Sequence, residues 1–151
     1  MAEFEFQKTN RFFAQVPGKM ENIAAEEFRK CGAEDVKEEY RGISFGASNK
    51  VIYTLNYTSR FASRILAPLT SFHCRSADIL TVKARRFPWE QIFTKDQTFS
   101  ISASVAKSAI TNSLYASQCL KDGIVDHFRD IYGVRPDVNT VSPDVRFNLH
   151  I

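Results

Sequence analysis

The chain has 151 residues, of which 44% are hydrophobic, 13% aromatic and 25% charged, so it can fill one full core or two small ones and is not typical of a disordered protein. No stretch approaches the roughly 20 apolar residues that a membrane span requires, and the polar N-terminus is not a secretory signal, so we expect a cytoplasmic protein without a membrane partner. The net charge of +3 is unevenly spread: residues 60–151 carry 12 basic and 8 acidic side chains, whereas residues 1–59 carry 8 and 9. The basic half favours a polyanionic partner, although an ordinary solvated surface would also account for it.

The N-terminal half alternates strand and helix patterns. Residues 1–10 are polar, and we expect them to fray as a disordered tail. Apolar spacing and the breaks at glycine and proline then predict a strand, a helix, two short strands around the Arg41-Gly42 turn, a second helix, and an extended strand interrupted by Pro68. These elements cover residues 11–16, 19–31, 36–40, 43–45, 50–58 and 64–74. The order β-α-β-β-α-β is that of a ferredoxin-like unit, in which two helices cover one face of an antiparallel sheet.

The inward faces of these two helices follow from their apolar spacing. In the first helix Met20, Ile23, Ala24 and Phe28 form the apolar stripe. In the second helix Val51, Leu55 and Tyr57 are expected to face the core. We therefore predict that each helix packs on the sheet by one side.

After residue 74 the pattern restarts. It predicts a helix over 77–87 with Ile79 and Val82 inward, a short helical turn after Pro88, a strand over 98–106, a long helix, and a final strand over 145–151. The long helix begins after Asn112 or Ser113 and ends at Gly133, and its apolar stripe is Leu120, Ile124, Phe128 and Ile131. We expect a mixed α+β or α/β fold whose two halves pack closely, because no low-complexity linker separates them.

No residue pattern indicates catalysis or a bound cofactor. The six glycines form neither GxG nor GxxxxGK, so the tight phosphate or cofactor turn of a nucleotide-binding enzyme is missing. The neighbouring carboxylates lie on faces predicted to be solvated, and Cys119 and His127 lie two helical turns apart, about 12 Å by helix rise, which is too far for a nucleophile and its base. Three widely spaced cysteines predict neither a disulfide framework nor a metal site.

The basic residues give the more informative signal. Lys83, Arg85 and Arg86 gather at the end of their helix, where they either contact phosphates or stabilise the helix C-terminus, and the two interpretations are about equally supported. Lys107 and Asn112 precede the long helix, where they form a phosphate cradle or an ordinary cap. The complete set of candidate RNA contacts is Lys83, Arg85, Arg86, Lys107, Asn112, Lys121, Arg129 and Arg135.

Four segments carry a resemblance to a known family: VPGKMENIAAEEFRKCGAEDV, YRGISFGA, NYTSRFASRILAPLTSF and LKDGIVDHFRDIYGVRPDVNTVSPDVRFNLHI. In order and spacing the chain resembles the N-terminal part of THUMP-domain RNA methyltransferases of the bacterial large-subunit rRNA guanine-N2 group. The resemblance implies a ferredoxin-like domain at 11–74 and a THUMP core at 75–151, with a family-style THUMP span that could begin near residue 46. Gly123 stands where the family pattern suggests Ala, at a cost of about 1 kcal/mol in helix propensity.

The resemblance also implies a partner and a division of labour. It implies RNA binding, with rRNA as the first candidate and tRNA as the second. The family's catalytic domain lies downstream and uses S-adenosylmethionine with an Asn-Pro-Pro-Tyr type motif; neither is present here, so we expect these 151 residues to be non-catalytic and to bind no cofactor of their own. Two alternatives stay open: a THUMP module of another RNA-modification enzyme, such as a thiouridine synthetase, and a ferredoxin-like module for protein interaction or dimerisation.

Overall fold

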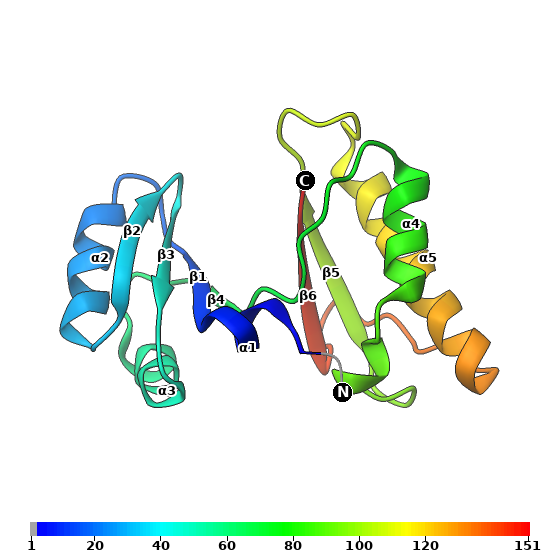
Figure 1. The fold of residues 1–151 in the computed structure, drawn as a ribbon, viewed down its shortest axis with the longest axis horizontal. Helices are drawn as coiled ribbons and strands as arrows, with labels where there is room; N and C mark the ends of the chain where they lie inside the picture. Colours follow the sequence, from blue (N-terminus) through cyan, green and yellow to red (C-terminus); the bar gives the residue numbers. More distant parts are fainter. Residues whose placement is uncertain (1–2) are drawn as a thin grey trace. The chain divides into compact units, whose positions relative to one another are not determined.

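The computed structural model describes residues 3–151 and divides into two compact units, one running to Ser71 and the other covering Phe72–Ile151 (Figure 1). The N-terminal unit consists, in chain order, of α1 (Glu5–Thr9), β1 (Arg11–Gln15), α2 (Glu21–Lys30), β2 (Glu34–Glu39), β3 (Gly42–Gly46), α3 (Asn49–Thr58) and β4 (Arg64–Leu66). Its four strands form one antiparallel sheet in the order β2-β3-β1-β4. The predicted β-α-β-β-α-β order is confirmed, and it produces the ferredoxin-like sheet.

The core of this unit lies between the sheet and helices α2 and α3. Phe28 of α2 meets Phe45 of β3 edge to face, with ring centroids 4.9 Å apart, and Leu55 of α3 is fully buried in the same cluster. The prediction that Ile23 and Tyr57 face this core is wrong, because they are 44% and 92% exposed. The buried side of α2 consists instead of Ala24, Ala25 and Phe28, small residues that let the helix lie close to the sheet.

The expectation of a disordered N-terminal tail is corrected for residues 3–10; residues 1 and 2 lie outside the described part of the chain. Phe4 is buried, and the ring of Phe6 lies 6.0 Å from that of Phe12 in β1. The backbone N–H groups of Glu5 and Phe6 donate to the carbonyl oxygens of Leu69 and Pro68 at 3.0 and 2.9 Å. Two phenylalanines and two long-range hydrogen bonds thus anchor a short helix that its polar composition concealed.

One edge of the four-stranded sheet is shorter than predicted, and the other consists mostly of exposed charged residues. The edge strand β4 has only three residues, where a strand over 64–74 was expected. Pro68 cannot donate to a strand ladder, and the chain beyond Leu66 instead accepts the hydrogen bonds of α1. The opposite edge is β2, sequence EDVKEE, in which every side chain except Val36 is exposed.

The C-terminal unit consists of α4 (Ala77–Arg86), the 3-10 turn η1 (Trp89–Gln91), β5 (Phe99–Ser104), α5 (Ser113–Tyr132) and β6 (Val145–His150). β5 and β6 pair in parallel, from Phe99 opposite Val145 to Ser104 opposite His150. At the start of this pair, the Asp144 carboxylate accepts hydrogen bonds from the backbone N–H and the hydroxyl of Thr98 at 2.8 and 3.0 Å. These bonds lower the pKa of Asp144 because they stabilise its ionised form.

An aromatic cluster fills the space between this strand pair and the helices. Its members are Trp89, Phe93, Phe99, Phe128 and Phe147, with neighbouring ring centroids 4.8–6.2 Å apart. The indole N–H of Trp89 donates to the carbonyl oxygen of Ala84 at 2.6 Å, so its one polar atom is satisfied inside the core.

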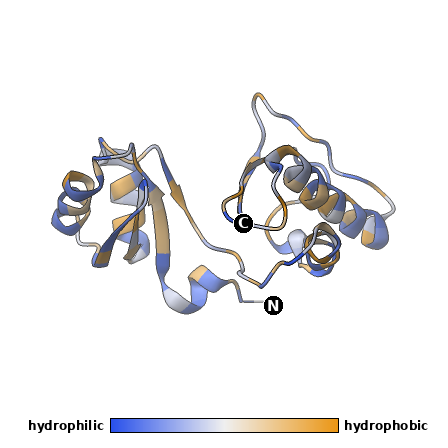
Figure 2. Cartoon of the chain, turned by 90° about the horizontal axis from the view of Figure 1, so that it is seen from above, coloured by the Kyte–Doolittle hydropathy of each residue, from blue (hydrophilic) through white to orange (hydrophobic). Residues whose placement is uncertain are grey.

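Three residues predicted to point inward in this unit do not. Ile79, Val82 and Ile131 are 36%, 48% and 51% exposed. On α4 the buried positions are Leu80 and Ala84, and on α5 the predicted Leu120, Ile124 and Phe128 are buried. The helices therefore carry hydrophobic residues on their outer sides as well. Figure 2 shows hydrophobic and hydrophilic residues mixed along them.

Candidate nucleic-acid interface

Helices α4 and α5 form a closely packed layer in which both run in the same direction. Thr81 of α4 donates its hydroxyl to the Cys119 carbonyl of α5 at 3.4 Å, and Ala84 lies against Gly123 further along both helices. A β-carbon on Gly123 would lie 2.4 Å from that of Ala84, so only glycine permits this separation. The residue that costs helix propensity is therefore the residue that allows the two helices to meet.

The N-terminus of α5 carries the predicted cap. Asn112 Oδ1 accepts the backbone N–H of Tyr115 at 3.1 Å, which assigns Asn112 the ordinary capping role considered for it. Lys107, in the preceding loop, is exposed and has a left-handed backbone with φ of 51°. Because α4 and α5 are parallel, the N-terminus of α4, capped by Ser76, lies at the same end of the layer. Two helix N-termini at one end of the layer favour anions there.

Arg85 forms an ion pair with a residue of α5. Its guanidinium donates two hydrogen bonds to the carboxylate of Asp130 on α5, at 2.7 and 2.9 Å. This pair lowers the pKa of Asp130 because the charged form accepts both bonds. Arg85 therefore links α4 to α5, and a phosphate would have to compete with Asp130 for it.

Three further candidates also lie beside carboxylates. Arg129 contacts Asp126 at 2.8 Å, one turn along the helix, and Arg135 approaches the same oxygen at 3.7 Å. Lys121 pairs with its neighbour Asp122 at 2.8 Å. These basic side chains are 41–55% exposed, and ion pairs of that kind are worth about 0–1 kcal/mol, so they leave the cations available to a stronger anion.

Lys83, Arg86 and Lys107 differ from the other candidates. All three are exposed, and none forms an ion pair with another residue between 3 and 151. Lys83 and Arg86 lie three residues apart in the last turn of α4, so their side chains are neighbours on one face. We refer to Lys83, Arg86 and Lys107 as the free cations.

One polar contact in this layer had no counterpart in the sequence prediction. The buried His127 of α5 lies between the carbonyl oxygen of Arg85, 2.8 Å from Nδ1, and the carboxylate of Glu90, 2.5 Å from Nε2. It joins α5 to the end of α4, 42 residues earlier in the chain, and to η1, 37 residues earlier. The only sequence feature that could have pointed to this contact is the position of His127 on the helix. It precedes the core residue Phe128 and lies on the buried side of α5.

Fold and surface together define a two-unit α+β protein in which a ferredoxin-like unit precedes a unit with a basic helical layer. Residues 74–151 match the family model of the THUMP domain, and residues 11–66 match that of the RlmL ferredoxin-like domain. The chain belongs to the THUMP domain family.

The chain is similar to longer proteins along nearly its whole length. It is 37% identical over 141 residues to the ribosomal RNA large subunit methyltransferase K/L of Syntrophotalea carbinolica, covering 93% of this chain and 20% of that relative. The chain thus spans about one fifth of the length of the curated relatives of this kind.

Solved structures share the fold. One is described as a predicted N6-adenine-specific DNA methylase from Listeria monocytogenes, with a TM-score of 0.73 at 22% identity, covering 93% of this chain and 36% of that one. Another is a 4-thiouridine synthetase bound to RNA and ATP, with a TM-score of 0.52 at 14% identity, covering 93% and 38%. At these identities the similarity shows the fold alone.

Proposed function

We propose that this chain binds RNA through its phosphate backbone and positions rRNA for the catalytic part of a longer methyltransferase. The observation that carries the proposal is the set of free cations on a THUMP unit whose other candidate cations lie beside carboxylates. An exposed cation without an internal partner gains most from a phosphate, because no existing ion pair has to be broken.

The identity of the relatives supports rRNA as the substrate. The 37% identical protein is named for methylation of large-subunit ribosomal RNA, and we extend that substrate to this chain, with tRNA as the second candidate. A-form RNA presents phosphates and 2′-hydroxyls and hides base edges in a deep groove, so a non-catalytic module of this type reads shape more than sequence. Its contribution would be orientation and a raised local concentration of the target guanine.

The residues of this chain do not fit S-adenosylmethionine. The parallel strand β5 is followed by residues 105–112, VAKSAITN, without the glycine that lets a backbone approach a cofactor closely. We therefore assign cofactor binding and methyl transfer to the remaining length of a longer protein. Residues 11–74 would be the ferredoxin-like domain and 75–151 the THUMP core.

The proposal is tested by anisotropy titration of a structured rRNA hairpin at 50 and 200 mM salt. Replacing the free cations together by Ala should weaken binding by about tenfold or more at low salt and reduce the slope of log K against log salt by about 2, since each lost phosphate contact removes about 0.7–0.9. The matched control replaces three exposed lysines of the N-terminal unit, Lys8, Lys30 and Lys50.

The control separates a specific surface from net charge. If both triple variants weaken binding equally, only total charge matters and the proposed surface is wrong. If the wild-type chain binds no RNA at either salt and its mass rises with concentration, the chain is an interaction or dimerisation module.

A further inference from the structure

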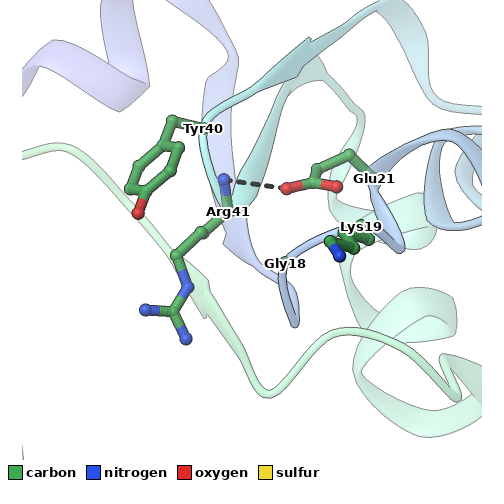
Figure 3. Close-up of a pocket in the computed structure, with 5 residues that line it drawn as sticks. All are labelled: Gly18, Lys19, Glu21, Tyr40 and Arg41. Atoms are coloured by element: carbon green, nitrogen blue, oxygen red, sulfur yellow. Dashed lines mark hydrogen bonds between the residues drawn. The ribbon is translucent and has the colours of Figure 1, made fainter.

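A hollow in the N-terminal unit lies outside the helical layer described above. It is lined by Gly18 and Lys19 after β1, Glu21 at the start of α2, and Tyr40 and Arg41 at the tip of the β2–β3 hairpin (Figure 3). The sequence pattern predicts this hairpin only as a tight turn. Its two residues, Tyr40 and Arg41, connect Glu39 and Gly42, which are paired across the strands.

The tip is held in place by its backbone. The Arg41 N–H donates to Glu21 Oε1 at 3.0 Å, and the Arg41 carbonyl oxygen accepts the N–H of Val16 at 3.1 Å. The next residue, Gly42, lies directly under the ring of Phe13, where a β-carbon would come within 2.0 Å of the ring. The turn is thus fixed on both sides, and its side chains project outward without rearrangement.

Tyr40 offers an aromatic ring to solvent. It is 89% exposed, so it contributes little to the core, and hairpin turns ordinarily favour Gly, Asn or Asp at such positions. Figure 3 shows its ring beside the side chain of Arg41, on the same side of the hairpin. An exposed ring next to a guanidinium is a suitable surface for stacking a nucleobase.

The two cations of the hollow occupy backbone conformations that basic residues rarely adopt. Lys19 has φ of 72° and Arg41 has φ of 53°, where glycine or asparagine would be less strained. Both are exposed, and neither forms an ion pair within the described chain. The one carboxylate present, Glu21, is engaged by the Arg41 N–H. Strain is thus retained at both cations that line the hollow, which favours a function for their side chains.

We propose that this hollow binds an unpaired nucleotide of RNA, with the base stacked on Tyr40 and a neighbouring phosphate held by Arg41 and Lys19. The proposal rests on RNA binding by the chain and adds a contact in the N-terminal unit. An unpaired nucleotide is the fitting ligand because bases within a duplex cannot reach a stacking surface, whereas those of loops and bulges can. The planar guanidinium supplies two donors to a phosphate.

The test compares two RNAs with equal numbers of phosphates, a hairpin with an unpaired loop and a fully paired duplex, bound to the whole 151-residue chain. Tyr40→Ser should weaken hairpin binding by about tenfold and leave duplex binding unchanged, because stacking is lost only with an unpaired base. Tyr40→Phe keeps the ring and should bind as the wild type does. Tyr57→Ser is the matched control, since Tyr57 is 92% exposed on α3 and does not line the hollow.

Arg41→Asn tests the cation without disturbing the turn, because asparagine tolerates the left-handed backbone. It should weaken hairpin binding and reduce its salt dependence while the unit stays folded by circular dichroism. As a direct readout, hairpin RNA carrying 5-iodouridine in its loop should crosslink to Tyr40, as identified by mass spectrometry.

The outcomes separate this site from the proposed function. Unchanged hairpin binding by Tyr40→Ser, together with weakened binding when the free cations are replaced, would contradict nucleotide binding in the hollow. It would leave the proposal of RNA binding by the chain intact. Equal loss on both RNAs would contradict the unpaired nucleotide. No binding of either RNA by the wild-type chain would overturn both proposals.

Discussion

Gly123 of α5 and Ala84 of α4 face each other between the two helices, and a β-carbon on Gly123 would lie 2.4 Å from Ala84 Cβ and 2.9 Å from the Thr81 carbonyl oxygen. Two opposing effects follow for Gly123→Ala. Helix propensity would favour alanine by about 1 kcal/mol, and the clash would force α4 and α5 apart at a typical overpacking cost of about 1–3 kcal/mol. Backbone atoms of Thr81 and Arg85 are among the neighbours and cannot rotate away.

We therefore expect Gly123→Ala to lower the free energy of unfolding of the C-terminal unit by up to about 2 kcal/mol. Urea denaturation followed by the fluorescence of Trp89, the chain's single tryptophan, measures this unit selectively. Gln118→Ala, at an exposed position of the same helix, is the control and should be neutral or slightly stabilising. A stabilised Gly123→Ala variant would contradict the close packing.

The Arg85–Asp130 pair predicts a gain of RNA affinity from the loss of a carboxylate. Asp130→Asn removes the charge that holds Arg85 and should tighten hairpin binding several-fold, while the unfolding free energy changes little because both side chains are nearly half exposed. Asp96→Asn removes the same charge from a carboxylate that pairs with Lys95, which is not a candidate contact. Equal tightening by both variants would show that only net charge is acting.

Acid should weaken the start of the β5–β6 pair. The hydrogen bonds from Thr98 lower the pKa of Asp144 in the folded state, so their stabilisation is complete above the unfolded pKa of 3.8 and is lost as pH falls through the lower folded value. Between pH 5 and pH 2, the unfolding free energy of Asp144→Asn should fall less steeply than that of the wild type. Thr98→Val, which removes the hydroxyl donor and keeps the backbone donor, should lie between them; identical slopes for all three chains would rule out this linkage.

Helix α1 should stabilise the N-terminal unit. Phe6→Ser removes the ring that packs on Phe12 and should cost about 1–3 kcal/mol. Because this unit contains no tryptophan, hydrogen exchange of the β1 and β3 amides is the suitable measurement, with faster exchange expected in the variant. Lys8→Ser, at an exposed position of the same helix, should leave exchange unchanged. Unchanged protection in Phe6→Ser would contradict this role of α1 and support the original prediction of a disordered tail.

Most of the fold could be predicted because the residues that end its helices and strands can be recognised locally in the sequence. Pro17-Gly18, Gly32 and Gly133 mark the ends of elements, and alternating apolar residues mark β5 and β6. Which helix face is buried was harder to predict, since α4 turns Leu80 and Ala84 inward and leaves Ile79 and Val82 outside. A helix that packs against another helix through small residues has no large apolar stripe to reveal it.

The surface chemistry was predictable only where its partners are close in sequence. The spacing of Asp126 and Arg129 is the usual one for an ion pair on a helix, and Lys121 precedes Asp122. The Arg85–Asp130 pair joins residues 45 apart, so no local pattern could distinguish an arginine in an ion pair from an unpaired one. Likewise, the Tyr40 hollow depends on a loop and a hairpin that only the folded sheet brings together.

The exposed edge strand β2 has a consequence for how the protein behaves in concentrated solution. An unpaired strand edge is a template onto which a second copy can add its own strand, the first step towards ordered aggregates. Glu34, Asp35, Glu38 and Glu39 make β2 strongly anionic, so two copies meeting along this edge repel each other. The irregular register between Glu34 and Lys37 further interrupts the flat ladder that an incoming strand would need. The like charges along β2 thus disfavour self-association at this edge during folding and storage.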